Sequence, residues 1–265
     1  MLKKIKSTIG NFGVWLIKLT AKKLKIDLIK LGYSENGILK SYSMTASGEI
    51  YFINTFLKQK VDSNSIFIDV GANKGEFSSL LRKAHPQAKI YAFEPNPNTF
   101  KLLNKNCGNS VQVINKGIGE QNGELNLFFD EDNITSEQAS SDPEILKTIA
   151  KSQNLTSVKI AITTLDQFTS KNGIEKIDFL KIDTEGFELE ALKGARLLLE
   201  RNKIRIIQFE FNEVNVVKRR FLKDFYDCLP GFDFYRLDTN RLIPLGEWEP
   251  FHEIFKFQNI IAIKS

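Results

Sequence analysis

The chain has 265 residues, 42% of them hydrophobic, which is enough to bury the core of one large domain. It contains two cysteines far apart, Cys107 and Cys228, and two histidines, so no Cys/His spacing predicts a zinc site, and a reducing, cytoplasmic location is expected. The net charge of +5 is unevenly spread, because residues 1–30 carry eight lysines against one aspartate. That segment has a net charge of +7, and the rest of the chain therefore sums to −2.

The first 50 residues are predicted to form a basic helical segment that precedes the main domain. Apolar residues recur there at helical spacing between lysines, although Gly10 and Gly13 weaken the helix. They are Leu2, Ile5, Ile9, Phe12, Leu16 and Leu19. The longest uncharged run, Ser7 to Ile17, is too short to span a membrane, and no cleavage pattern of a signal peptide follows.

Two interpretations of residues 1–30 stay open. A basic amphipathic helix can pack on the domain and turn its lysines to solvent, which is the interpretation we favour. The same pattern is typical of a helix that lies on an anionic membrane, which would add peripheral contact at the inner membrane surface to the expected cytoplasmic location.

Residues 51–265 are predicted to form one α/β domain. Short apolar runs alternate with amphipathic helical patterns from residue 65 onward. Seven runs are predicted as strands: 65–70, 89–94, 111–115, 177–183, 204–211, 232–237 and 259–264. Strands this apolar are covered on both faces, which favours a doubly wound, Rossmann-like sheet that is mostly parallel and ends in an antiparallel pair.

One segment interrupts the alternation. Residues 124–129 and 158–165 are also predicted as strands, and the stretch between them is polar and rich in serine. We interpret residues 130–157 as a surface insertion near the site, with a short helix after Pro143. A solvated loop and a lid over the substrate are equally compatible with this composition.

The turn after the first predicted strand, "FIDVGANKGEFS", carries the first candidate ligand residues. In a doubly wound sheet the first strand–helix turn cradles the ligand, and Asp69, Gly71, Asn73 and Gly75 occupy it. A dinucleotide fingerprint would have glycine in place of Asn73 and no acid before Gly71. Because Asp69 can accept hydrogen bonds from an ammonium group but repels a pyrophosphate, the turn suits an amino-acid moiety.

The second candidate is Glu94, which ends the second predicted strand in "YAFEPNP". A carboxylate at this place can accept hydrogen bonds from both hydroxyls of a ribose. The acidic glycine turn and the acid after the second strand together predict a nucleoside that carries an amino-acid tail.

Several stretches in the right order resemble the FkbM family of S-adenosylmethionine-dependent methyltransferases: "FIDVGANKGEFS", "AFEPNPNTFKLLNKN", "NKGIGEQNGELNLF" and "IDFLKIDTEGFELEALKGA". The resemblance runs from about residue 65 to 211 and implies a class I methyltransferase fold. It implies that the cofactor is S-adenosylmethionine, with Asp69, Gly71, Asn73 and Gly75 around its methionine part and Glu94 at its ribose. Asn115 and Gly117 fall where its adenine is expected.

The resemblance further implies O-methylation of a hydroxyl on a sugar or a polyketide-type product. In "KIDTEGFE", Asp183 ends the fourth strand and Glu185 follows in the turn, so both are predicted as catalytic. A carboxylate can take the proton that the acceptor hydroxyl loses, and a Mg²⁺ ion held by carboxylates can make that loss easier by binding the oxygen. Glu210 would be the third acid of such a metal site, whereas capping of the next helix is the alternative role for Glu185. Lys181, inside the strand, is not counted as functional.

A second class of function uses the lysine-rich N-terminus as an electrostatic footprint in a nucleotide-binding or nucleic-acid-modifying protein. The predicted active edge is acidic, and the basic residues lie elsewhere, so a nucleic acid is not expected at the site. The favoured acceptor is therefore a small molecule or a glycan.

Overall fold

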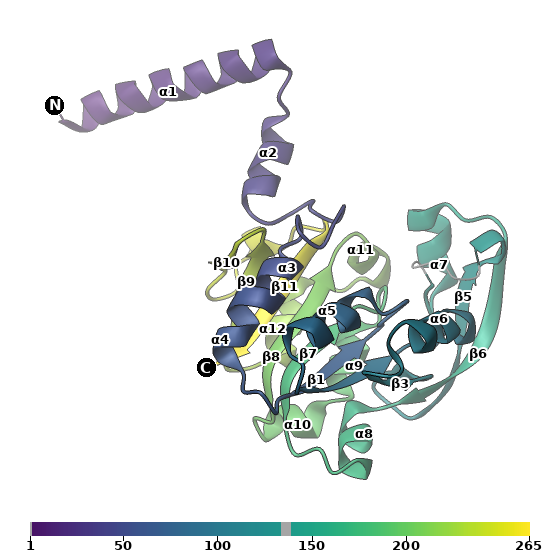
Figure 1. The fold of residues 1–265 in the computed structure, drawn as a ribbon. Coiled ribbons are helices and arrows are strands. Elements are labelled where there is room, and N and C mark those ends of the chain that lie inside the picture. The colour runs from purple at the N-terminus through teal and green to yellow at the C-terminus, as the bar shows by residue number, and fades with distance from the viewer. Residues whose placement is uncertain (1, 134–138) are drawn as a thin grey trace.

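The computed structural model describes residues 2–133 and 139–265 (Figure 1). Its centre is an eight-stranded sheet in the order β10-β9-β11-β8-β7-β1-β2-β3. The strands are β1 (Ile66–Val70), β2 (Lys89–Phe93), β3 (Gln112–Ile114), β7 (Ile177–Ile182), β8 (Ile204–Phe211), β9 (Phe232–Asp238), β10 (Arg241–Pro244) and β11 (Gln258–Lys264). All seven strands predicted for the main sheet are present.

The pairing of the strands confirms a doubly wound sheet whose final pair is antiparallel. β1 pairs in parallel with β2 on one side and with β7 on the other, so the strand order reverses at β1. β11 runs antiparallel to both of its neighbours, β8 and β9. The eighth strand, β10, was not predicted because it is four residues long and ends in Pro244, which a sheet accepts at its edge.

Helices cover both faces of the sheet. One face packs against η1 (Phe52–Leu57, a π-helix), α5 (Glu76–Ala84) and α6 (Pro97–Cys107). The other packs against α8 (Leu165–Lys171), α9 (Glu188–Lys193), α10 (Arg196–Glu200) and α12 (Leu222–Cys228). Three more short helices belong to this part of the domain: α3 (Glu49–Tyr51), α4 (Lys58–Lys60) and α11 (Val214–Lys218). A 3₁₀ turn follows at Pro250–His252.

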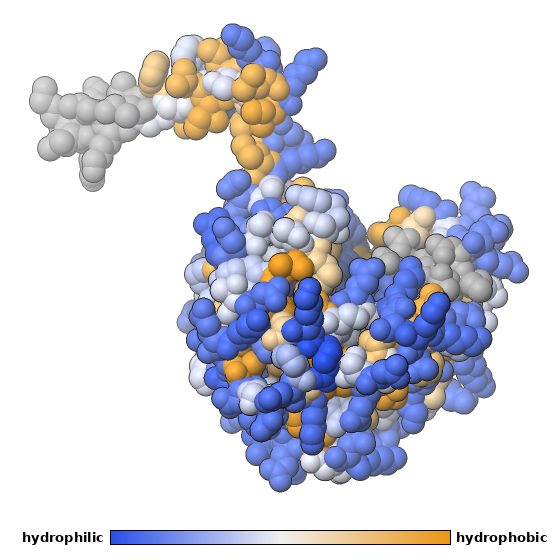
Figure 2. Space-filling model, in the orientation of Figure 1, coloured by the Kyte–Doolittle hydropathy of each residue, from blue (hydrophilic) through white to orange (hydrophobic). Residues whose placement is uncertain are grey.

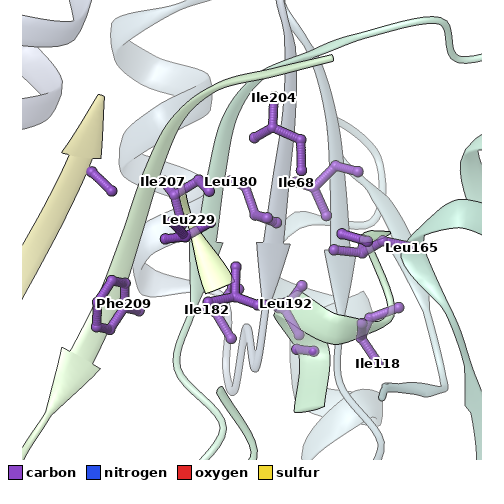
Figure 3. Packing of buried hydrophobic residues seen from close by; sticks show 14 of the residues in the cluster. Ile68, Ile118, Leu165, Leu180, Ile182, Leu192, Ile204, Ile207, Phe209 and Leu229 are labelled. Atoms are coloured by element: carbon purple, nitrogen blue, oxygen red, sulfur yellow. The ribbon is translucent and has the colours of Figure 1, made fainter. Parts of the chain in front are cut away.

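Alternation along the strands distributes their side chains between the two layers. Phe67 packs in the layer of α5, and its neighbour Ile68 packs in the layer of α9. In the second layer, Ile68, Leu180, Ile182 and Ile207 of three adjacent strands meet (Figure 3). The strands are therefore covered on both sides, as their apolar sequences predict.

A second sheet of three strands stands beside the first, in the order β4-β6-β5. Its strands are β4 (Gly117–Ile118), β5 (Gly123–Asp130) and β6 (Leu155–Thr163). The segment between β5 and β6 contains a 3₁₀ turn at Glu131–Asn133, then α7 (Pro143–Ile145) and the π-helix Leu146–Ala150, so the helix predicted after Pro143 is present. The middle of the predicted insertion, residues 134–138, lies outside the described residues.

The N-terminal arm, which we define as α1 (Leu2–Leu24) and α2 (Leu28–Glu35), projects away from the domain (Figure 1). Our favoured interpretation, a helix packed on the domain, is wrong for its described side chains. Phe12, Leu16 and Leu19 of the predicted apolar stripe are exposed, and α2 has no buried residue. Within the described part of the chain, no helix is both long and apolar enough to cross a membrane.

The chain joins the domain directly after the arm, well before the predicted boundary at residue 50. Ile38 is fully buried, and Leu39 N donates to Phe257 O at 2.9 Å. Lys40 forms an ion pair with Asp238 (2.6 Å). Residues 37–49 therefore belong structurally to the domain, and only α1 and α2 stand apart.

Candidate functional site

A cavity of about 540 Å³ opens at the carboxyl ends of β1, β2, β7 and β8, beside the point where the strand order reverses. Doubly wound sheets bind their ligands at this place. Residues of the segment 41–49, which follows the arm, form another part of the cavity wall. Of the predicted site residues, those that line the cavity are Asp69, Gly71, Asn73, Glu94, Asp183, Glu185 and Glu210.

The glycine turn after β1 requires its glycines. Gly71 has φ +81°, and a Cβ built there would lie 1.7 Å from the backbone oxygen of Asp183. Gly75 has φ +90°, and its Cβ would lie 2.8 Å from Cys107 Sγ. The N–H groups of Gly71 and Ala72 both donate to Phe93 O at 2.9 Å, which fixes the turn to β2. The absent side chains let the ends of β1 and β7 approach closely, so the turn is open toward a ligand.

Two oxygens in this turn are buried without a hydrogen-bond partner among the described residues. Asp69 Oδ2 accepts from the Ser78 hydroxyl at 2.6 Å, but Asp69 Oδ1 accepts nothing, and neither does Asn73 Oδ1. Burial raises the pKa of Asp69, although the nearby Lys181 ammonium lowers it. Unpaired buried acceptors are costly, so they indicate a ligand that brings hydrogen-bond donors.

Glu94 follows β2, and its carboxylate holds the ends of two loops. Its Oε2 accepts from Asn73 N at 3.0 Å and its Oε1 from Asn96 N at 2.8 Å. Burial raises the pKa of Glu94 to about 7, although these two N–H groups favour the charged form. Glu94 therefore orders the glycine turn in addition to facing the cavity.

The two residues predicted at the adenine lie in different surroundings. Asn115 lines neither cavity described here, and its amide donates to Glu94 O (2.8 Å) and Pro95 O (3.1 Å). Gly117 lines a second, small cavity of about 40 Å³ beside the first, with Phe93, Ile118 and Ile162. This second cavity is apolar and shares Gly71 with the large one.

Asp183 follows β7 and is paired with a buried lysine. Lys181 Nζ donates to Asp183 Oδ2 at 2.8 Å, and it lies 4.9 Å from the centre of the Phe77 ring. The Lys181 side chain is 7% exposed, whereas that of Asp183 is 36% exposed, so the carboxylate faces the cavity. Burial alone would lower the pKa of Lys181, but Asp183, Asp69 and Glu49 together raise it. Lys181 is therefore positively charged at neutral pH.

The turn after Asp183 is capped by Glu188 rather than by Glu185. Glu188 accepts from Thr184 N (2.9 Å) and from Gly186 N (3.1 Å), and it is buried. Glu185 has φ +53°, and its backbone oxygen accepts from the Ser140 hydroxyl at 2.9 Å. Glu188 therefore has the capping role that was considered for Glu185. The Glu185 side chain lines the cavity.

Two further acids line the cavity away from the glycine turn. Glu210 of β8 accepts from Asn212 Nδ2, and burial raises its pKa well above the usual value, as do the charges of Asp183 and Glu185. Glu49 accepts from Ser47 (3.0 Å) and Gln208 (3.0 Å), and burial raises its pKa too, although Lys181 opposes the shift.

Lys181 and Glu49 are site residues that the sequence analysis did not assign. The sequence could have assigned Lys181 to the site, because it lies two positions before Asp183 on a strand, and residues at this spacing share a face of the sheet. Glu49 had no such signal, since it begins the short helix α3 and reaches the cavity through a contact with Gln208 of β8, 159 residues away in sequence.

The metal candidates Asp183, Glu185 and Glu210 do not form a metal-binding group in the structure. Among residues 2–133 and 139–265, no three His, Cys, Asp or Glu side chains are placed to hold one ion. The positive charge that contacts Asp183 is the ammonium of Lys181.

The strand order, the glycine turn after β1 and the acid after β2 define a class I methyltransferase fold. Residues 69–238 match the methyltransferase FkbM domain, which is more than half of the chain. The chain therefore belongs to the FkbM methyltransferase family.

The chain is also similar to individual methyltransferases. Methyltransferase sdnD of Sordaria araneosa is 29% identical, over 55% of this chain and 66% of that protein. The 2-O-methyltransferase NoeI of Sinorhizobium fredii is 23% identical, over 63% and 72%. The hexuronic acid methyltransferase AglP of Haloferax volcanii is 25% identical, over 57% and 59%. The matches thus span between 59% and 72% of the length of these three relatives.

Proposed function

We propose that this protein transfers a methyl group from S-adenosylmethionine to a hydroxyl of a sugar, a glycan or a polyketide-type product. The observation that carries the proposal is the single cavity that joins the glycine turn to the Lys181–Asp183 pair. The names of two relatives support oxygen as the acceptor atom and a sugar as its carrier, since NoeI is a 2-O-methyltransferase and AglP methylates a hexuronic acid.

The residues of the turn fit S-adenosylmethionine. The unpaired Oδ1 of Asp69 suits the ammonium of the methionine part, and Glu94 suits the ribose hydroxyls. The apolar residues around Gly117 suit contact with one face or edge of the adenine ring, since the cavity they line is too small to enclose it. When bound, the cofactor supplies a methyl group on a sulfonium, which needs little further activation.

The chain must then orient the acceptor hydroxyl and take its proton. Asp183 is the proposed base, because its carboxylate faces the cavity and Lys181 holds it in place at 2.8 Å. The charge of Lys181 also stabilises the oxygen as it becomes negative, since a buried ammonium acts through a low dielectric. Glu185 lies beside Asp183 in the same wall and completes the acidic edge.

The acceptor's other hydroxyls would meet the wall formed by Glu49, Glu210 and Asn259. Burial raises the pKa of both acids, and their carboxyl oxygens can accept hydrogen bonds from hydroxyl groups. An amide and two such carboxyls suit a polyhydroxylated acceptor. They do not suit a polyanion, which argues against a nucleic acid here.

The test is transfer of labelled methyl groups from S-adenosylmethionine to a panel of free sugars, uronic acids, glycans, polyketides and RNA. We expect an O-methyl product, identified by mass spectrometry and NMR, with the Asp183→Asn protein as the inactive control. Labelling of RNA, or of nitrogen or carbon in the product, would contradict the proposal.

A further inference from the structure

The N-terminal arm is rich in exposed large apolar side chains. Eleven of the seventeen exposed large apolar side chains in the described part of the chain lie between residues 12 and 31. They are Phe12, Val14, Trp15, Leu16, Ile17, Leu19, Leu24, Ile26, Leu28, Ile29 and Leu31. Figure 2 shows these orange residues gathered on the arm, next to blue basic side chains. Apolar clusters of this kind mark an interaction surface.

The apolar residues of α1 lie on more than one side of the helix. Phe12, Trp15 and Leu19 follow one face at helical spacing, and Val14, Ile17 and Leu24 follow the opposite one. Phe12 is 62% exposed and Leu24 is also 62% exposed, so neither face is covered by the domain. A surface that covers this helix must therefore surround it on several sides.

The arm is strongly basic. Residues 1–30 carry eight lysines, and their only acid, Asp27, caps α2 by accepting from Ile29 N (2.9 Å) and Lys30 N (3.1 Å). The arm therefore attracts an anionic surface and repels the same arm of a second copy. The domain itself carries no comparable excess, because residues 31–265 sum to −2.

We propose that the N-terminal arm docks this protein on an anionic membrane surface. A helix that lies at the headgroup level can bury apolar residues on several sides while its lysines extend their charged ends to the phosphates. Trp15 and Phe12, which stack at 5.8 Å between ring centres, are residue types that favour this depth. The arm lies on the surface and does not cross it, in agreement with its limited apolar length.

Docking would also hold the cavity near the bilayer. The chain from Glu35, where α2 ends, to Ser41 of the cavity wall spans at most about 20 Å when extended. The arm and the site are thus connected by a short and firmly attached segment.

Binding to vesicles tests the proposal and is independent of methyl transfer. The full chain with Trp248→Phe keeps Trp15 as its single tryptophan. Its fluorescence is expected to shift to the blue with vesicles of phosphatidylcholine and phosphatidylglycerol (about 3:1), and the protein should float with them. Pure phosphatidylcholine should bind it at least tenfold more weakly, and about 0.5 M salt should weaken binding to the anionic vesicles.

Matched variants assign the binding to the arm. Replacement of Lys18, Lys22 and Lys23 by Glu should lower partition into anionic vesicles on the order of 100-fold or more. Replacement of the exposed domain lysines Lys101, Lys105 and Lys171 by Glu makes the same change in net charge and should alter partition less than threefold. Trp15→Glu should likewise lower partition into anionic vesicles, whereas the domain control Phe251→Glu should not, because Phe251 is exposed but lies outside the arm.

Three results would overturn the proposal. One is the absence of binding to anionic vesicles by a protein whose melting curve shows it to be folded. Another is equal loss in the arm and control variants. The third is a dimer, seen by light scattering, that depends on Trp15 and does not bind vesicles, since the arm would then cover a second copy.

Discussion

At the scale of single residues, the site depends on a buried charge pair. Lys181 is almost fully buried, and such a charge is stable only beside carboxylates like that of Asp183, 2.8 Å away. The same contact fixes the Asp183 carboxylate at the cavity wall, where the proposed proton acceptor is needed. Lys181 thus matters both for the stability of the carboxyl end of β7 and for the reaction proposed there.

Replacement of Asp183 by Asn should lower turnover by about 10²- to 10⁴-fold, the usual contribution of a general base. Affinity for S-adenosylmethionine should stay within a few-fold, because Asn keeps the size of the side chain. Lys181→Met should also lower turnover, because the acceptor oxygen loses the nearby positive charge as it becomes negative. Single-turnover rates and calorimetry measure both effects. Turnover of Asp183→Asn within threefold of the parent would show that another group takes the proton.

Glu94 should contribute to cofactor affinity in two separable ways. It accepts from two backbone N–H groups, and it is proposed to accept from the ribose. Glu94→Gln should weaken binding of S-adenosylmethionine by roughly 1.5 to 3 kcal/mol, the worth of hydrogen bonds to a charged group. Calorimetry with an analogue that lacks the ribose hydroxyls separates the two roles. If the variant loses as much affinity for the analogue as for the cofactor, Glu94 acts on the loop alone.

The raised pKa of Glu94 predicts how stability depends on pH. Its folded-state pKa of about 7 lies above the ordinary value of 4.5, so between these pH values the folded protein binds a proton that the unfolded chain releases. The free energy of unfolding should therefore fall as pH rises from about 4.5 to about 7, with a contribution from Glu94 of roughly 3 kcal/mol at most. Urea denaturation of the ligand-free protein at several pH values measures this, and Glu94→Gln should reduce the slope. Equal slopes in the two proteins would contradict the assignment.

At the scale of elements, the turn between β1 and α5 combines backbone strain with close packing. Gly71→Ala places a methyl group 1.7 Å from Asp183 O at a φ of +81°, so the turn must move. Gly173→Ala is a matched control, because its φ is +62° but nothing lies within 4 Å of the new methyl group. We expect the control to lose about 1 kcal/mol of stability and Gly71→Ala to lose more, with cofactor binding abolished. Thermal melting and calorimetry test this, and equal behaviour of the two variants would refute it.

The elements also show which parts of the site the sequence can predict. Asp69, Glu94 and Asp183 were assigned because each ends an apolar strand, and the carboxyl ends of parallel strands meet at one edge. Glu49 reaches the same cavity from a segment without periodicity, and only tertiary contacts place it. The exposed arm was misjudged because an apolar stripe indicates that a surface covers a helix and does not say which one.

At the scale of the whole molecule, the boundary between arm and domain governs what can be removed. Among residues 10 and 12–30, whose side chains the structure describes, Ala21 alone is buried, whereas residues 37–49 bury Ile38, Ala46 and Ser47 and line the cavity. Gly48 allows residues 37–49 to pack closely on the domain, because a Cβ built there would lie 2.1 Å from Asp238 O. The two parts of the predicted N-terminal segment therefore differ in their role.

Deletion of residues 1–30 should leave the melting temperature within about 2 °C and the affinity for S-adenosylmethionine unchanged, because small Ala21 is the one buried side chain among residues 10 and 12–30. Deletion of residues 1–48 should lower the free energy of unfolding by several kcal/mol, since a fully buried Ile38 alone contributes about 1.5 to 3 kcal/mol and the Lys40–Asp238 pair is lost with it. Differential scanning calorimetry and cofactor titration of the two proteins measure the contrast. If the shorter deletion already melts early or aggregates, the arm covers core surface in solution and its exposed placement is wrong.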